Sequence, residues 1–212
     1  MSRFDALIFD IDGTLWDTRE ILARGYNKYL AREGYGHIHV DAALLLTVFG
    51  KTTEAIADAI FPDYPVPQRY DMILGCMDTG REEMLADPCR VEYPGVVETL
   101  EKLSKEYRLF VVSNSESGYP DLLLDKLGVR HLFEGYLCYG DTRTCKGETI
   151  RILMDRYRIG SAIYIGDTQG DLEACRMAGI PFIHCAYGFG DPEEYVAVVD
   201  QFPQLPDVLK NL

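Results

Sequence analysis

The chain has 212 residues, of which 47% are hydrophobic, and a formal net charge of −13. That length allows one sizeable α/β domain, or a core domain with a small accessory unit. The acidic balance argues against binding to nucleic acid or to an anionic membrane surface, and no apolar run approaches the ~20 residues of a membrane span.

The first predicted element is a short buried strand, "ALIFD" at residues 6–10, which ends in acidic residues. Asp10 and Asp12 are separated by one residue, so their side chains lie on the same side of an extended segment. Gly13 and Thr14 follow at once, and Gly13 breaks the strand. Asp167, which follows a later strand, would bring a third carboxylate to the same crevice, and such a group stays ionised only if a cation neutralises it.

The region from Trp16 to about Asp87 contains helical patterns and no convincing strand. Together these patterns form an insert of roughly 70 residues, far longer than the usual 2–6 residues of a βα loop. The sequence therefore predicts two domains, a core of residues 1–15 and 88–212 and an all-helical domain of residues 16–87. Trp16 is interpreted as a packing residue. The helices are expected at 18–34, 40–48, 52–60 and 68–86, with a proline-rich break at 61–67.

The rest of the chain alternates between short apolar strands and amphipathic helices. This alternation predicts right-handed βαβ units and a doubly wound, three-layer α/β core with a parallel sheet. The strands are almost continuously apolar, as strands covered on both faces are. Strands are expected at 108–113, 135–140, 162–167 and 180–185, and helices at 95–107, 119–129, 146–159 and 170–180.

Polar side chains follow the strands, where ligands of open α/β sheets bind. Carboxylates crowded there, with room for waters and a phosphate, provide the hard oxygen ligands that suit Mg²⁺. The alternative is that the acids only cap helices. The residues expected at this edge are Asp10, Asp12, Thr14, Ser113, Asn114, Lys146, Asp167 and Asp171.

These motifs resemble the four signatures of the haloacid dehalogenase superfamily, in its phosphatase branch. The DxDGT signature begins at Asp10, Ser113 closes the second strand, Lys146 starts a helix, and the GDxxxD signature ends at Asp171. The resemblance covers essentially the whole chain and implies a Rossmann-like core. The helical insert is similar to the C1 cap of phosphoglycolate-phosphatase-like and β-phosphoglucomutase-like members.

The resemblance implies a Mg²⁺-dependent phosphomonoesterase that acts on a small phosphorylated metabolite, as phosphoglycolate phosphatases do. Asp10 would be the nucleophile that forms an aspartyl-phosphate, and Asp12 the general acid and base. Lys146 would neutralise a phosphoryl oxygen and the nucleophile. Asp10, the backbone carbonyl of Asp12, and Asp167 would hold the metal, with Asp171 as a direct or indirect partner.

Four further residues are candidates for substrate binding. Ser113 and the backbone N–H of Asn114 would bind phosphoryl oxygens. Thr14 is as well explained as a turn residue. Lys51 precedes a helix in the insert and could meet an anionic substrate, although an exposed lysine is the commoner interpretation.

Other functions remain open at this stage. A β-phosphoglucomutase-like phosphomutase would use the same core residues and return the phosphoryl group to a sugar. A dehalogenase would not need Asp12 or the carboxylate cluster. A phosphorelay receiver also combines acids, a hydroxyl and a lysine, but its acceptor aspartate follows a middle strand. A catalytically silent binding protein would not require the full set of acids.

The six cysteines form no CxxC pair and no zinc-finger spacing. They are interpreted as reduced thiols of a cytoplasmic protein. We expect a monomer whose partner is its small phosphorylated substrate.

Overall fold

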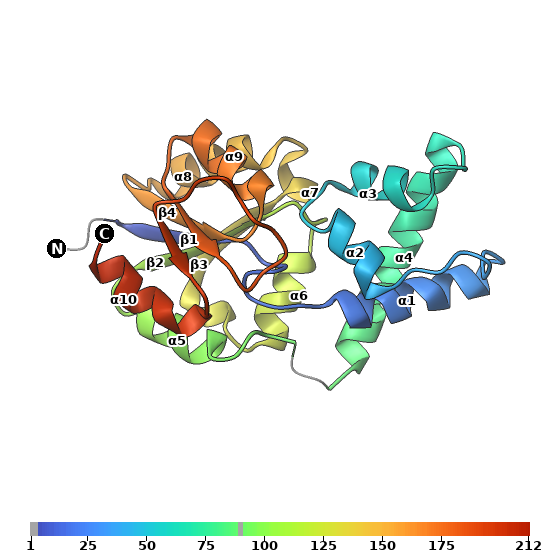
Figure 1. Cartoon of the computed structure of the whole chain (residues 1–212), viewed down its shortest axis with the longest axis horizontal. Coiled ribbons are helices and arrows are strands. Elements are labelled where there is room, and N and C mark those ends of the chain that lie inside the picture. The colour runs from blue at the N-terminus through green and yellow to red at the C-terminus, as the bar shows by residue number, and fades with distance from the viewer. Residues whose placement is uncertain (1–3, 89–90) are drawn as a thin grey trace. The chain divides into compact units, whose positions relative to one another are not determined.

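The computed structural model describes residues 4–88 and 91–212, and this part of the chain forms one six-stranded parallel sheet (Figure 1). The strand order is β3-β2-β1-β4-β5-β6, so the chain first builds outward on one side of β1 and then on the other. The point where the direction reverses lies beside β1, and ligands of doubly wound sheets bind at such points. The strands are β1 (Ala6–Phe9), β2 (Arg108–Ser113), β3 (Phe133–Cys138), β4 (Ala162–Gly166), β5 (Phe182–Cys185) and β6 (Ala197–Val199).

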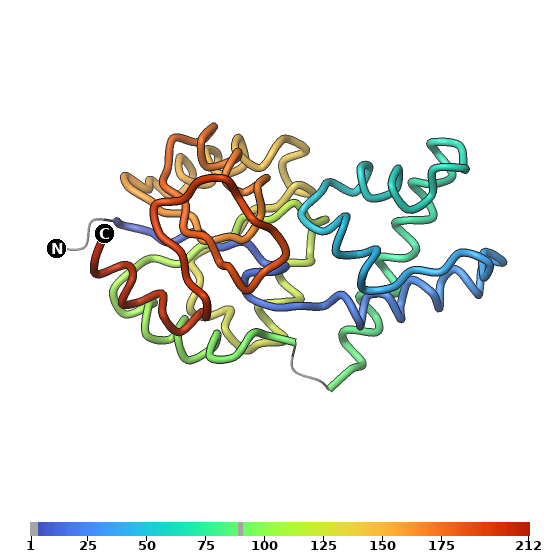
Figure 2. The backbone as a smooth tube through the Cα atoms, viewed as in Figure 1, coloured from blue at the N-terminus to red at the C-terminus, as the bar shows by residue number. Residues whose placement is uncertain are grey.

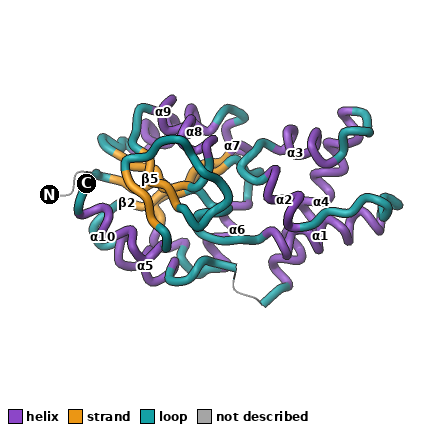
Figure 3. The backbone as a smooth tube through the Cα atoms, viewed as in Figure 1, coloured by secondary structure: helices purple, strands orange, loops and turns teal. Residues whose placement is uncertain are grey.

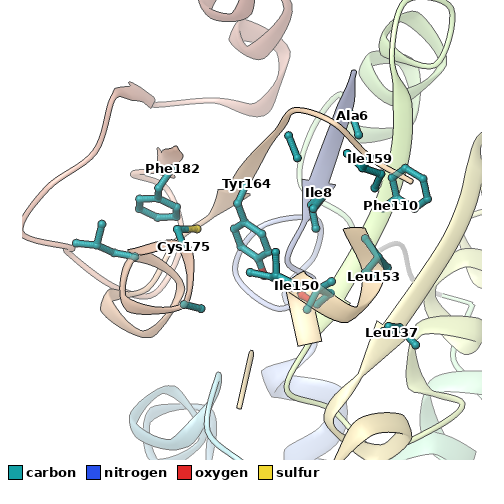
Figure 4. Close-up of a cluster of buried hydrophobic side chains, with 14 residues drawn as sticks. Ala6, Ile8, Phe110, Leu137, Ile150, Leu153, Ile159, Tyr164, Cys175 and Phe182 are labelled. Atoms are coloured by element: carbon teal, nitrogen blue, oxygen red, sulfur yellow. Dashed lines mark hydrogen bonds between the residues drawn. The ribbon is translucent and has the colours of Figure 1, made fainter. Parts of the chain in front are cut away.

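Strand β1 is apolar and buried at every position because both faces of the sheet are covered. In β1, Ala6 and Ile8 face one hydrophobic cluster, and Phe9 points to the other face, where its ring lies 6.0 Å from that of Phe202. Side chains from β2 and β4 join the first cluster in the same alternating pattern. Figure 4 shows this cluster, which includes Ala6, Ile8, Phe110, Val112, Leu137, Ile150, Leu153, Tyr164, Cys175 and Phe182.

Helices cover the two faces and make the predicted three layers. Helices α8 (Lys146–Tyr157) and α9 (Gln169–Ala178) pack together on one face, and α5 (Val96–Leu103) and α10 (Leu205–Lys210) lie together on the other (Figure 1). Helix α6 (Tyr119–Lys126) and a short helix α7 (Tyr139–Thr142) complete the described connections, with single-turn helices η1 (Arg130–Leu132) and η2 (Phe202–Gln204). The prediction of a doubly wound α/β core with a parallel sheet is confirmed.

A second compact unit, residues Asp17–Val91, is built from helices and loops throughout its described part (Figure 3). Its helices are α1 (Arg19–Arg32), α2 (Ala42–Val48), α3 (Thr53–Ile60) and α4 (Val66–Ala86). The two longest, α1 and α4, cross closely where Gly25 meets Gly80, because a Cβ atom on Gly25 would lie 2.5 Å from the Cα of Gly80. We call Asp17–Val91 the helical unit and the remainder the core unit.

The two connections to the helical unit are paired with each other. In the core unit, Trp16 forms an antiparallel bridge with Glu92, and the N–H of Tyr93 donates to the carbonyl of Leu15 at 3.1 Å. One step further along, the N–H of Asp17 donates to the carbonyl of Val91 at 2.9 Å. We call residues 15–17 and 91–93 the paired linkers, and both segments can be found on the tube trace in Figure 2.

Some element boundaries differ from the sequence prediction. The third strand was expected at 135–140, but β3 begins at Phe133, and Tyr139 and Gly140 belong to α7 instead. The strand ends there because Asp141 accepts a hydrogen bond from the N–H of Cys138 at 3.0 Å and thereby caps a helical turn. The short elements β6 and α10 were not predicted, since three and six residues carry too little periodicity to detect.

In the described part of the chain, no helix is both long and apolar enough to cross a membrane. Five cysteines in that part are free thiols, and Cys89 lies outside it. Cys138, Cys175 and Cys185 are buried, as their apolar surroundings in the sequence indicate.

Candidate active site

The register of the sheet brings the ends of β1 and β4 together. Phe9, the last residue of β1, pairs with Val111 on one side and Ile165 on the other. The next residue, Asp10, continues this pattern because its N–H donates to the carbonyl of Ile165 at 2.9 Å. Asp10 therefore lies beside Asp167, which follows β4 directly.

Three carboxylates are buried together at this edge of the sheet. Asp10 is 3% exposed, and Asp167 and Asp171 are 0% exposed. Each offers one oxygen, and these three oxygens lie within 4.8 Å of one another. Burial of several like charges is strongly unfavourable unless a cation compensates them.

Lys146 supplies one positive charge to this cluster. It is the first residue of α8 and is 6% exposed. Its Nζ donates to Oδ1 of Asp10 at 3.0 Å and to Oδ1 of Asp171 at 2.6 Å. The ammonium group also lies 5.8 Å from the ring centre of Tyr164, whose hydroxyl donates to the carbonyl of Val112 at 2.7 Å. Lys146 is thus fixed between two carboxylates and a rigid aromatic ring.

The pKa values of the three acids are driven apart. Burial raises the pKa of Asp10 to about 7, although Lys146 partly opposes this. Burial and the charges of Asp171 and Asp10 raise the pKa of Asp167 well above its usual range. Burial acts on Asp171 too, but Lys146 and Thr168 outweigh it and hold its pKa below the usual value. Asp10 and Asp167 are therefore the acids whose negative charges are least compensated.

Asp171 has a structural task at the start of α9. Its Oδ2 accepts hydrogen bonds from the N–H of Thr168 at 3.0 Å and from the hydroxyl of Thr168 at 2.7 Å. In return, the hydroxyl of Thr168 accepts a bond from the N–H of Asp171 at 3.2 Å, which completes a capping box. Since Lys146 contacts the other oxygen, Asp171 fits an orienting role better than direct coordination of a metal. Helix capping was the alternative to a metal site that the sequence left open for these acids, and Asp171 caps α9 while it also pairs with Lys146.

Asp167 is held by two loops. The hydroxyl of Thr14 donates to its Oδ1 at 3.1 Å, and the N–H of Phe189 donates to its Oδ2 at 2.7 Å. In each loop, a glycine lies so close to Asp167 that a side chain would not fit. A Cβ atom on Gly13, which has φ +85°, would lie 2.1 Å from Oδ2 of Asp167, and one on Gly188 would lie 2.3 Å from its Cβ.

Asp12 lies at the same edge and has different neighbours. Its Oδ1 accepts a hydrogen bond from Nε1 of Trp16 at 2.9 Å and another from the hydroxyl of Tyr119 at 2.7 Å. Trp16 therefore does more than pack, and it belongs to the core unit rather than to the helical unit. The sequence signal for it is its spacing of four residues from Asp12. Tyr119 carries no comparable signal, because it is distant in sequence.

The remaining candidates fall into different surroundings. Ser113 is the buried last residue of β2, and its Oγ accepts a hydrogen bond from the N–H of Ser115 at 3.2 Å. Asn114 follows it and is half-buried. The Oγ of Ser115 is buried and has no hydrogen-bond partner among the described residues. Lys51 is exposed and lies between α2 and α3 of the helical unit.

Comparison with known proteins shows which family the chain belongs to. A family model described as haloacid dehalogenase-like hydrolase matches residues 7–185, which is most of the chain. The chain belongs to this family. The resemblance inferred from the four motifs is therefore confirmed, as is the prediction of a phosphatase-like enzyme.

Several relatives of this family member carry phosphatase names. The chain is 29% identical over 217 residues to a phosphoglycolate phosphatase of Agrobacterium fabrum, covering 95% of this chain and 91% of that protein. It is 26% identical over 228 residues to the phosphoglycolate phosphatase of Rhodobacter capsulatus, covering 97% of each.

Solved structures share the fold. A predicted phosphoglycolate phosphatase from Haemophilus somnus has a TM-score of 0.82 at 22% identity, covering 98% of this chain and 99% of that one. CbbY from Rhodobacter sphaeroides, in complex with xylulose-(1,5)bisphosphate, has a TM-score of 0.78 at 20% identity, covering 95% and 96%. At identities this low, the likeness shows a common fold and does not identify the substrate.

Proposed function

We propose that this haloacid dehalogenase-like hydrolase is a Mg²⁺-dependent phosphomonoesterase that acts on a small phosphorylated metabolite through an aspartyl-phosphate on Asp10. The observation that carries the proposal is the buried group of Asp10, Asp167 and Asp171 beside the ammonium group of Lys146. Three carboxylates and one lysine leave two negative charges, which a divalent cation would balance.

The donor set suits Mg²⁺. Asp10 and Asp167 would hold the ion together with the backbone carbonyl of Asp12, and Asp171 would orient this shell through Lys146 and Thr168. Burial raises the pKa values of Asp10 and Asp167, and a cation beside them would favour their ionised forms. When bound, Mg²⁺ would screen the repulsion between the attacking carboxylate and the phosphate.

The chain's own residues would carry the phosphoryl transfer. Lys146 fixes the orientation of Asp10 through Oδ1 and would neutralise one phosphoryl oxygen. Ser113 and the N–H of Asn114 would bind other phosphoryl oxygens at the end of β2. A carboxylate oxygen of Asp10 then attacks phosphorus in line with the leaving alcohol, and the P–O bond to the alcohol breaks.

Asp12 would move the protons. In the first half-reaction it donates a proton to the departing alkoxide, and in the second it takes a proton from the attacking water. That water adds to phosphorus, the bond to Asp10 breaks, and inorganic phosphate leaves. Asp12 returns to its starting protonation state, so the cycle balances.

The substrate class rests on the relatives and on the helical unit. The curated relatives are named as phosphoglycolate phosphatases, which supports a short phosphorylated carboxylic acid as substrate. We propose that the helical unit selects the substrate and that Lys51 contributes a positive charge for such a carboxylate. Thr14, whose hydroxyl donates to Asp167, is better suited to supporting the metal site than to contacting substrate.

The test is a panel of phosphorylated metabolites, with phosphoglycolate, sugar phosphates, nucleotides and pyrophosphate, assayed with Mg²⁺ and after exhaustive chelation. We expect many turnovers per enzyme with Mg²⁺, the highest kcat/KM for a phosphorylated carboxylic acid, and loss of turnover on chelation. Full activity without a divalent ion would refute the mechanism.

The same panel separates the alternatives. A phosphomutase would transfer the phosphoryl group to a sugar hydroxyl and release little inorganic phosphate. A receiver-like protein would be phosphorylated once and would not turn over p-nitrophenyl phosphate.

A further inference from the structure

Two hydrogen bonds to Asp12 end on the same oxygen. Nε1 of Trp16 and the hydroxyl of Tyr119 both donate to Oδ1, at 2.9 and 2.7 Å. Two donors on the same oxygen fix the rotation of the carboxylate, and the direction of Oδ2 is fixed with it. Hydrogen bonds to a charged oxygen are stronger than neutral ones, so this restraint is firm.

The two donors are themselves held in place. Trp16 is fully buried, its carbonyl accepts from the N–H of Gly13 at 2.9 Å, and its backbone pairs with Glu92. Tyr119 begins α6, a separate element that follows β2. Its ring meets that of Trp16 edge-on, with the centroids 5.7 Å apart and the planes at 67°. The aromatic pair thus forms a rigid support on one side of Asp12.

The chemistry of the donors keeps this restraint one-sided. An indole N–H can only donate, so Oδ1 of Asp12 must act as the acceptor of the bond from Trp16.

We propose that Trp16 and Tyr119 are positioning residues that orient the carboxyl group of Asp12 for proton transfer. This rests on the proposed function, in which Asp12 serves as the general acid and base. Both residues act through Asp12 and need not touch the substrate.

Conservative variants remove the donors and keep the rings. Tyr119→Phe deletes the hydroxyl, and Trp16→Phe deletes the indole N–H. Each is assayed with Mg²⁺ on phosphate esters whose leaving groups range from an alkyl alcohol to p-nitrophenol. Tyr136→Phe is the matched control, because the hydroxyl of Tyr136 also donates to a carboxylate, that of Asp121, at 2.5 Å.

The expected result depends on the leaving group. Poor leaving groups need a proton from a well-oriented acid, so kcat/KM for the alkyl ester should fall at least about tenfold in each variant. For p-nitrophenyl phosphate, kcat/KM should hardly change, and Tyr136→Phe should behave as the parent protein. An intact kcat/KM for the activated ester also shows that each variant is folded.

The same substitutions made in an Asp12→Asn background separate this proposal from the proposed function. If the donors act through Asp12, Tyr119→Phe should cause no further leaving-group-dependent loss there. Equal losses for all esters, or an undiminished effect in the Asp12→Asn background, would overturn the positioning role. If Asp12→Asn alone had no leaving-group-dependent defect, the general-acid assignment itself would be wrong.

Discussion

Asp10 and Asp12 are chemically identical side chains two positions apart, yet their neighbours give them different capacities. Asp10 is buried against Lys146 in the carboxylate cluster, whereas Asp12 is bound by two neutral aromatic donors. The sequence motif placed both at the end of β1. It contained no information about Tyr119, the donor to Asp12 that comes from a distant helix.

Replacing each of the two aspartates should impair a different step of the reaction. Asp10→Asn removes the nucleophile, so we expect no phosphoenzyme and no measurable turnover. Asp12→Asn keeps the backbone carbonyl and Asp10, and should lower turnover of an alkyl phosphate by about 10²–10⁴-fold, the usual contribution of proton transfer. With an activated ester, Asp12→Asn should trap a phosphoryl group on Asp10, detectable by rapid quench and mass spectrometry. A higher residual activity in Asp10→Asn would contradict the assignment.

The raised pKa of Asp10 predicts that metal binding releases protons. Without metal, Asp10 binds a proton below about pH 7, and the cation must displace it. Asp167 shifts in the same direction, whereas Asp171 is held ionised by Lys146. The apparent Mg²⁺ affinity should therefore increase as the pH rises through about 7. Calorimetry in two buffers of different ionisation enthalpy would count the released protons, and an affinity independent of pH would contradict the prediction.

At the scale of elements, regular strands and helices were predictable and their irregular ends were not. The buried strands that end at Phe9, Ser113 and Gly166 could be predicted from apolar runs in the sequence. A strand that is covered on both faces has apolar side chains at nearly every position, so it stands out as such a run. Helix α7 was missed because it depends on a single cap by Asp141.

The residues of the candidate site likewise include some that could be predicted from the sequence and some that could not. Its acids and Lys146 lie next to predicted strands and helix starts, so their convergence could be predicted. The contact from Phe189 to Asp167 could not, since a backbone N–H has no sequence signature. The only local sign of this loop is its glycine content, which the close approach of Gly188 explains.

Replacing Gly188 should weaken the metal site. In Gly188→Ala the new methyl group would collide with Asp167, so the loop must move and the bond from Phe189 must lengthen. Because partners of metal ligands typically contribute 10–100-fold to affinity, we expect a loss of about that size in the affinity for Mg²⁺. Gly36→Ala is the control, as its Cβ would meet the nearest atom at an ordinary 3.7 Å. Unchanged metal binding in Gly188→Ala would show that the loop adapts freely.

On the scale of the whole molecule, the paired linkers make the helical unit an insertion with adjacent ends. Replacing residues 18–90 by a short flexible linker should leave the core unit folded, because its sheet and covering helices lie outside the insertion. The shortened protein should still bind Mg²⁺ and hydrolyse p-nitrophenyl phosphate, while turnover of the metabolite falls much further.

A point variant tests the same role without shortening the chain. Lys51→Ala should raise KM for a phosphorylated carboxylic acid and leave p-nitrophenyl phosphate unaffected. Lys28→Ala, which removes an ion pair with Glu83 inside the helical unit, is the control. Equal losses on both substrates after excision of the helical unit would argue against its role in selection.

The paired linkers also bear on the order in which the protein folds during synthesis. Strand β1 is made first, but its neighbours, β2 and β4, lie on the far side of the helical unit in sequence. Joining such distant segments carries an entropic cost of loop closure and slows folding. A helical unit that folds early brings Asp17 and Val91 together and removes most of that loop. The insertion that separates the two parts of the core in sequence would thereby lower the entropic cost of pairing β1 with β2 and β4.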